Sequence, residues 1–166
     1  MEPGFSERLE RAGDLADIYE LVKEAARVSI GRERGGLMLA LADLGNHPRG
    51  FLGAFYPLDS NAIVMNRVPL ARIQATRPEL YKPYVFMVLL HEYLHALRFH
   101  DEEQTRIQTY RICRAVLGEE SPATRMALDP LRYFPNLVFP DAAWSPDITR
   151  FEIVPGFDRS SASYIR

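Results

Sequence analysis

The chain has 166 residues and a formal net charge of −2, and 47% of its residues are hydrophobic and 25% charged. This length and composition are typical of a globular domain that buries its own core, and they exclude disordered, collagen-like and coiled-coil classes for the chain as a whole. The charge balance predicts no nucleic-acid partner, because non-specific binding to nucleic acids is driven by a basic surface.

The sequence also bears on the compartment. Cys113 is the single cysteine, so no intrachain disulfide can form, which fits a reducing environment. The N-terminus has neither the basic start nor the apolar core of a secretion signal. The longest apolar run, residues 84–90, is far shorter than a membrane span. We therefore expect a cytoplasmic protein with no membrane partner.

The first predicted element is a helix that begins after Asp14, a good N-cap residue, and ends at Gly31. Its apolar residues recur at helical spacing; they are Leu15, Ile18, Tyr19, Val22 and Ala26. Three short apolar stretches follow, at residues 37–42, 51–56 and 61–65, and they predict a small, mostly antiparallel sheet.

The most apolar helix is predicted from Tyr84, just after Pro83, to about Arg98. The chain then breaks at residues 99–102, where Asp101 is a candidate N-cap. A second helix is predicted to run to Leu117, and a short third helix covers residues 121–128.

From Pro130 the composition changes to alternating proline and aromatic residues, which is too aromatic for a disordered linker. We therefore predict a main domain at residues 1–129 and an irregular extension at residues 130–166 that packs on the same domain. A strand is possible at residues 150–154.

The motif with clear chemical meaning is H-E-x-x-H at His91–His95. Two histidines four residues apart lie on one face of a helix, so both imidazoles can bind one zinc ion. Glu92, rotated by about 100° around the helix, can flank the metal without binding it and can take a proton from the metal-bound water. The alternative is that both histidines are hydrogen-bonded structural residues and that Glu92 is solvated, although three polar side chains are costly within so apolar a helix.

This motif, on an apolar helix that follows a strand-rich segment, resembles the zincin metallopeptidases, and most of all the small gluzincin-type peptidases of archaea. The resemblance covers residues 14–128. It implies an α+β, zincin-like fold with an N-terminal helix, a small sheet, the active-site helix and C-terminal helices. It also implies that an extended substrate pairs with an edge strand above the metal, either Gly50–Tyr56 or Asn61–Met65. The metzincin continuation is absent, because Arg98 and Asp101 replace its glycine and its third histidine.

Four residues remain as candidates for the third metal ligand: His100, Asp101, Glu102 and Glu103. On a straight helix Glu102 would share the face of His95 but lie about 10 Å further along the axis. Any of the four can therefore ligate only if the helix breaks near residues 98–100. A gluzincin uses a glutamate of the following helix, which favours Glu102, then His100, then Glu103. The alternative is that these acids only favour a helix N-terminus electrostatically.

We therefore predict a zinc-dependent metallopeptidase with one Zn²⁺ per chain, held by His91, His95 and Glu102. Glu92 is the general base that activates water for attack on a peptide or protein substrate. The alternative is a zincin-fold metal-binding module with a regulatory or protein-interaction role and no peptidase activity.

The extension at residues 130–166 suggests two further roles. It could recognise a partner through Trp144 and its neighbours. It could also lie in the active-site cleft and inhibit the enzyme, because it carries carboxylates that could reach a metal: Asp141, Asp147, Glu152 and Asp158.

Overall fold

The computed structural model describes residues 4–44, 46–47, 50–139 and 151–157, and it has a mixed α+β fold. The helices of these residues are α1 (Phe5–Arg11), α2 (Leu15–Ile30), α3 (Arg67–Thr76), α4 (Tyr81–Ala96), α5 (Glu102–Leu117), α6 (Pro122–Leu128) and α7 (Pro130–Tyr133), with a 3₁₀ turn at Pro78–Leu80. The strands are β1 (Met38–Ala42), β2 (Asn46–His47), β3 (Gly50–Leu52), β4 (Ala54–Phe55), β5 (Ala62–Asn66), β6 (Leu137–Val138) and β7 (Glu152–Ile153).

The long N-terminal helix, α2, has the ends that its sequence predicts. The Asp14 side chain accepts a hydrogen bond from the backbone N–H of Asp17, which satisfies one of the free donors of the first turn. Gly31 ends the helix in the left-handed conformation, with φ of 68°, which glycine adopts without steric strain. One face of α2 packs on α4, where Tyr19 and Tyr93 meet edge to face at 5.7 Å.

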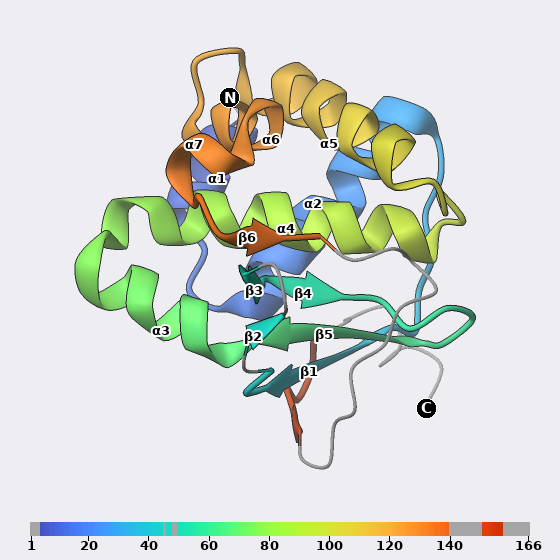
Figure 1. The fold of residues 1–166 in the computed structure, drawn as a ribbon. Coiled ribbons are helices and arrows are strands. Elements are labelled where there is room, and N and C mark those ends of the chain that lie inside the picture. Colours follow the sequence, from blue (N-terminus) through green and yellow to red (C-terminus); the bar gives the residue numbers. More distant parts are fainter. Residues whose placement is uncertain (1–3, 45, 48–49, 140–150, 158–166) are drawn as a thin grey trace.

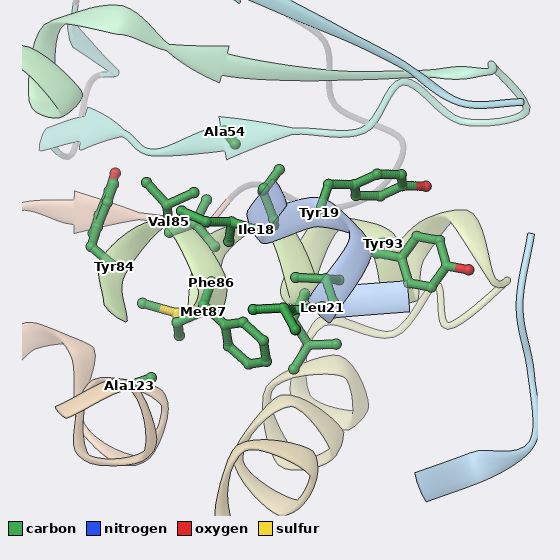
Figure 2. Packing of buried hydrophobic residues seen from close by; sticks show 14 of the residues in the cluster. Ile18, Tyr19, Leu21, Ala54, Tyr84, Val85, Phe86, Met87, Tyr93 and Ala123 are labelled. Carbon is green, nitrogen blue, oxygen red and sulfur yellow. The ribbon is translucent and has the colours of Figure 1, made fainter. Parts of the chain in front are cut away.

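Helix α4 lies at the centre of the molecule, with the sheet on one side and α5 and α6 on the other (Figure 1). It begins at Tyr81, three residues before the predicted start, because Pro83 is tolerated in the first turn of a helix. It ends at Ala96, two residues earlier than predicted. Every residue from Tyr84 to Ala96 is buried, because a helix that is apolar on most sides is stable only inside the core. Figure 2 shows its side chains packed between α2, β4 and α6.

The sheet is mixed, so the prediction of a mostly antiparallel sheet was wrong for its central pair. The strand order is β4-β5-β1-β7, and β1 and β5 run parallel from Met38 opposite Ala62 to Ala42 opposite Asn66. The pairs β4–β5 and β1–β7 are antiparallel. A second small sheet has the order β2-β3-β6, with β3 and β6 parallel. Alternating apolar residues identify strands but not their direction, which depends on how the intervening chain reverses.

One of the two candidate edge strands was also wrong. Residues 61–65 belong largely to β5, which lies between β4 and β1 and has both edges paired. The other candidate, residues 50–56, contains β4, which is an edge strand of the four-stranded sheet.

The described residues after Pro130 pair with strands of the preceding chain. Strand β6 adds to β3, and β7, within the stretch where a strand was predicted, adds to β1. Phe157 is 3% exposed and stacks on Tyr19 with ring centroids 4.0 Å apart. Four residues considered above lie outside the described residues; they are Asp141, Trp144, Asp147 and Asp158.

None of the described helices is both long and apolar enough to cross a membrane.

Candidate metal centre

The H-E-x-x-H residues lie on the last turn and a half of α4, inside the core. His91 and His95 are one turn apart, and their rings meet at a centroid distance of 5.0 Å. His91, Glu92 and His95 are each 1% exposed. Their ligand atoms all lie within 4.8 Å of one another, so these three residues are close enough together to hold a metal ion.

The helix breaks between α4 and α5, which a third ligand from residues 100–103 requires. Arg98 has φ of 79°, and the N–H of Phe99 bonds the carbonyl of Leu94, which closes the helix end with a tight reversal. The Asp101 side chain then accepts a hydrogen bond from the N–H of Gln104 and starts α5, which confirms it as an N-cap. The turn thus brings the first residue of α5 back over the face of α4 that carries the histidines.

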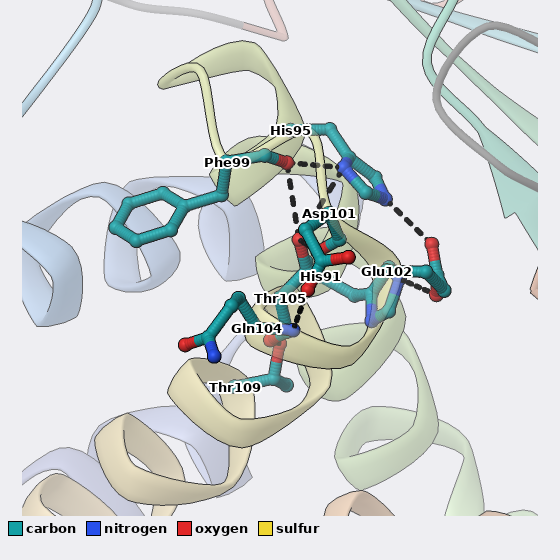
Figure 3. Close-up of polar contacts among 8 residues, drawn as sticks. All are labelled: His91, His95, Phe99, Asp101, Glu102, Gln104, Thr105 and Thr109. Atoms are coloured by element: carbon teal, nitrogen blue, oxygen red, sulfur yellow. Dashed lines mark hydrogen bonds and ion pairs between the residues drawn. The ribbon is translucent and has the colours of Figure 1, made fainter.

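That first residue is Glu102, whose carboxylate faces both rings (Figure 3). Its Oε1 lies 2.7 Å from Nε2 of His91, and its Oε2 lies 3.1 Å from Nε2 of His95. The other candidate ligands have different positions. His100 and Glu103 are exposed, and Asp101 is occupied as the helix cap.

Three buried atoms at this cluster lack a hydrogen bond of good geometry among the described residues: Nε2 of His91, Oε1 of Glu102 and Oε2 of Glu92. The first two are only 2.7 Å apart, so they converge without sharing a well-aligned proton. Buried polar atoms are rarely left without a partner, because the lost solvation costs about 1–3 kcal/mol per group. A cation between His91 and Glu102 would satisfy the first two of these atoms.

The contacts of His95 also favour a positive charge at this cluster. Its Nδ1 donates to the backbone carbonyl of Phe99 at 2.6 Å, and the Thr105 hydroxyl donates to the same carbonyl at 3.0 Å. In the neutral ring this leaves a lone pair on Nε2, opposite a carboxylate oxygen that is also an acceptor. The pair is favourable only with a positive charge, either a second ring proton or a metal ion. A backbone carbonyl that orients the ring through its other nitrogen is a common support for a metal-binding histidine.

The two carboxyl groups have opposite electrostatic surroundings. Burial opposes ionisation of Glu102, but its contacts with His91 and His95 outweigh burial and hold its pKa at about 2. Burial raises the pKa of Glu92 above its ordinary value, although His91 and His95 partly oppose this. Glu102 therefore ionises more readily than an ordinary glutamate, whereas Glu92 holds its proton more readily.

Phe139, which directly follows β6, lies against one side of the cluster. The Phe139 ring lies 4.5 Å from the His91 ring, tilted by 31°. Glu102 is the most open member, with its side chain 20% exposed. Sequence reasoning missed Phe139, Thr105 and the Phe99 carbonyl, because no motif marks them; their roles arise from the turn and from the return of the chain after α7.

No protein-family model matches the chain, and neither the curated proteins nor the solved structures contain a significant match. The support for a metal site is thus the H-E-x-x-H residues, buried on one helix and close enough together to bind an ion.

Proposed function

We propose that the protein is a zinc-dependent metallopeptidase of zincin-like fold, with His91, His95 and Glu102 as the metal ligands and Glu92 as the general base. The observation that supports it most is the position of Glu102, whose two oxygens face the two Nε2 atoms at 2.7 and 3.1 Å. Two imidazole nitrogens and one carboxylate oxygen form a common donor set of catalytic zinc sites.

Both carboxylates near the histidines are close enough to ligate, and their contacts favour different roles. Glu102 reaches over both rings from a different helix, as a third ligand would. Glu92 lies on α4 itself, rotated by about 100° from His91, and it has a buried Oε2 without a hydrogen bond among the described residues. Its raised pKa suits a group that accepts a proton and returns it to a leaving amine. Bound zinc would supply Lewis acidity, which favours a hydroxide nucleophile near neutral pH and polarises a carbonyl.

Strand β4 supports a peptide substrate. It is an edge strand of the four-stranded sheet and packs against α4, the helix that carries the histidines. An edge strand can pair with an extended peptide through main-chain hydrogen bonds, which would hold the peptide along the cluster.

The first experiment measures metal content and turnover together. Full-length protein, purified without chelator or a metal-affinity tag, is expected to contain about one zinc per chain by plasma mass spectrometry. Glu92→Gln is expected to keep the zinc and to cleave quenched peptides at least about 100-fold more slowly, since it removes only the general base. No zinc after incubation and desalting, or an unchanged rate in Glu92→Gln, contradicts the proposal.

A second candidate function is a metal-binding interaction module without turnover, and the burial of the cluster favours it. His91, Glu92 and His95 are each 1% exposed, and structural metal sites are closed whereas catalytic sites keep an open position. This alternative predicts zinc without peptide cleavage by the wild type, and a melting temperature that falls sharply when a chelator removes the metal.

Self-inhibition would reconcile a closed site with peptidase activity, and Phe139 is the residue that would maintain it. Phe139→Ala is expected to speed peptide cleavage relative to the wild type because it uncovers His91. Phe134→Ala is the matched control, since Phe134 packs on Tyr84 instead. Equal rates in the wild type and Phe139→Ala would exclude this mechanism. Removal of residues 129–166 is a poorer test, because it also removes β7 and the buried Phe157.

A further inference from the structure

A pocket of about 400 Å³ opens beside the candidate metal centre and shares His95 with it. It lies between the C-terminal end of α4, the segment before β1 and the turn after β4. The residues that matter for its chemistry are Arg34, Tyr56, Asp59, His95, Arg98 and His100. Its volume is at the small end for ligand pockets and suits one amino-acid residue better than a large cofactor.

Arg34 is held rigidly in this pocket. One guanidinium nitrogen donates to the Tyr56 hydroxyl at 3.0 Å and to the Ala96 carbonyl at 3.1 Å, and the other donates to the Ser60 carbonyl at 2.9 Å. All three acceptors are uncharged, so the positive charge stays uncompensated by these contacts. The backbone N–H of Arg34 also donates to the Tyr93 hydroxyl. A fixed cation of this kind loses little side-chain entropy when an anion binds.

Arg98 also lines the pocket, and its backbone has an unusual conformation. It occupies the left-handed position that ends α4, with φ of 79°, where glycine is the preferred residue. A non-glycine residue there is strained, and such strain often marks a functional site. Asp59, with φ of 61°, is the other non-glycine residue of positive φ in the described chain, and it lines the same pocket. Among the described residues, no ion pair joins Arg34 or Arg98 to a carboxylate.

We propose that this pocket binds a carboxylate of the substrate, so that the substrates are peptides with an acidic group next to the cleaved bond. The fixed guanidinium group of Arg34 provides the planar donor pattern that a carboxylate accepts, and Arg98 adds a second positively charged residue to the lining. Asp59 is the one acidic residue of the lining and limits the affinity. The carboxylate is either the C-terminus of the peptide or an Asp or Glu side chain. The peptide nature of the ligand rests on the proposed function, but the preference for a carboxylate does not.

The test measures binding without turnover, by NMR titration of the full-length Glu92→Gln protein as purified, with its metal content unchanged. Three acetylated tetrapeptides that end in Gln-amide, Gln with a free carboxylate, and Glu-amide are the probes. The first has no carboxylate, and the other two place one at the terminus or on the side chain. We expect at least one acidic peptide to bind about tenfold or more tightly than the neutral one, and to shift the amide signals of residues 96–100.

Two variants distinguish a binding role from a structural one. Arg98→Gly keeps the left-handed turn, so it is expected to leave the melting temperature unchanged or higher while most of the preference for acidic peptides is lost. Asp59→Asn is expected to tighten the binding of acidic peptides, because it removes the opposing charge.

The outcomes are separable from those of the peptidase test. Equal affinity for all three peptides, or a full preference in Arg98→Gly, overturns the carboxylate subsite whether or not the protein cleaves peptides. A clear preference in a protein that binds zinc but never cleaves a peptide overturns the proposed function and leaves the subsite in place. The stronger of the two acidic peptides identifies the source of the carboxylate.

Discussion

Two adjacent glutamates at the start of α5 have different surroundings. Glu102 and Glu103 both occupy the first turn of α5, where the positive end of the helix dipole stabilises a negative charge. Successive helical residues point about 100° apart, so Glu102 faces the histidines while Glu103 is exposed. The helix break and the resemblance favour Glu102 from the sequence, but the rotation of α5 toward the histidines is seen only in the structure.

The pair therefore provides a matched prediction. Glu102→Gln is expected to raise the dissociation constant for zinc at least about 100-fold, because it replaces the anionic ligand by a neutral amide. Glu103→Gln makes the same change in charge one residue away and is expected to leave zinc affinity within about twofold, since it is exposed to solvent. Competition with a chromophoric chelator measures both, and equal effects would exclude Glu102 as a ligand.

Cys113 lies on the buried side of α5, 0% exposed, and burial raises the pKa of its thiol well above the ordinary value. The thiolate is the reactive form, so the native protein is expected to react with a disulfide reagent about 100-fold or more slowly than the same protein in urea. The rate of absorbance change on labelling measures this. Fast labelling of the native protein would show that α5 opens readily.

At the scale of elements, the contact between α4 and the β3–β4 segment requires a glycine. A Cβ on Gly53 would lie 2.9 Å from the Tyr84 hydroxyl and 3.2 Å from a methyl group of Leu137. Tyr84 is fully buried, and its hydroxyl has no hydrogen-bond partner among the described residues. The β3–β4 segment thus approaches α4 most closely at the Tyr84 hydroxyl, which makes no hydrogen bond with the described residues.

This contact predicts a double-mutant effect. Gly53→Ala is expected to lower the free energy of unfolding by about 1–3 kcal/mol through overpacking. Tyr84→Phe removes an unpartnered hydroxyl and is expected to be close to neutral, within about 1 kcal/mol. In the Tyr84→Phe background Gly53→Ala is expected to cost clearly less, because the nearest clashing atom is gone. Urea unfolding of the four proteins measures the coupling, and strictly additive effects would contradict it.

At the scale of the whole molecule, the described residues after Pro130 include members of the core, Leu137 and Phe157. Strand β7 pairs with β1 at the sheet, and Phe157 stacks on Tyr19 of α2. These contacts join residues more than a hundred positions apart, so we expect the described part of this segment to unfold together with the rest.

Two phenylalanines of this segment test that expectation. Phe157→Ala is expected to lower the free energy of unfolding by about 3–5 kcal/mol, the usual cost for a buried phenylalanine. Phe151 is 61% exposed, and Phe151→Ala is expected to change stability by less than about 0.5 kcal/mol. A single cooperative transition in both variants is expected by circular dichroism. A small effect of Phe157→Ala would mean that the segment is only loosely attached.

Local sequence alone predicted the features that depend on neighbouring residues. Asp14 and Asp101 as caps, Gly31 as a helix end and His91 and His95 on one helical face all follow from hydrogen bonding and periodicity within a few residues. The tertiary structure decided the parallel pairing of β1 with β5, the interior place of β5, the cover of Phe139 over His91 and the pocket that gathers Arg34, Asp59 and Arg98. These contacts join segments far apart in the chain, and their geometry depends on how the whole core packs, which no local pattern encodes.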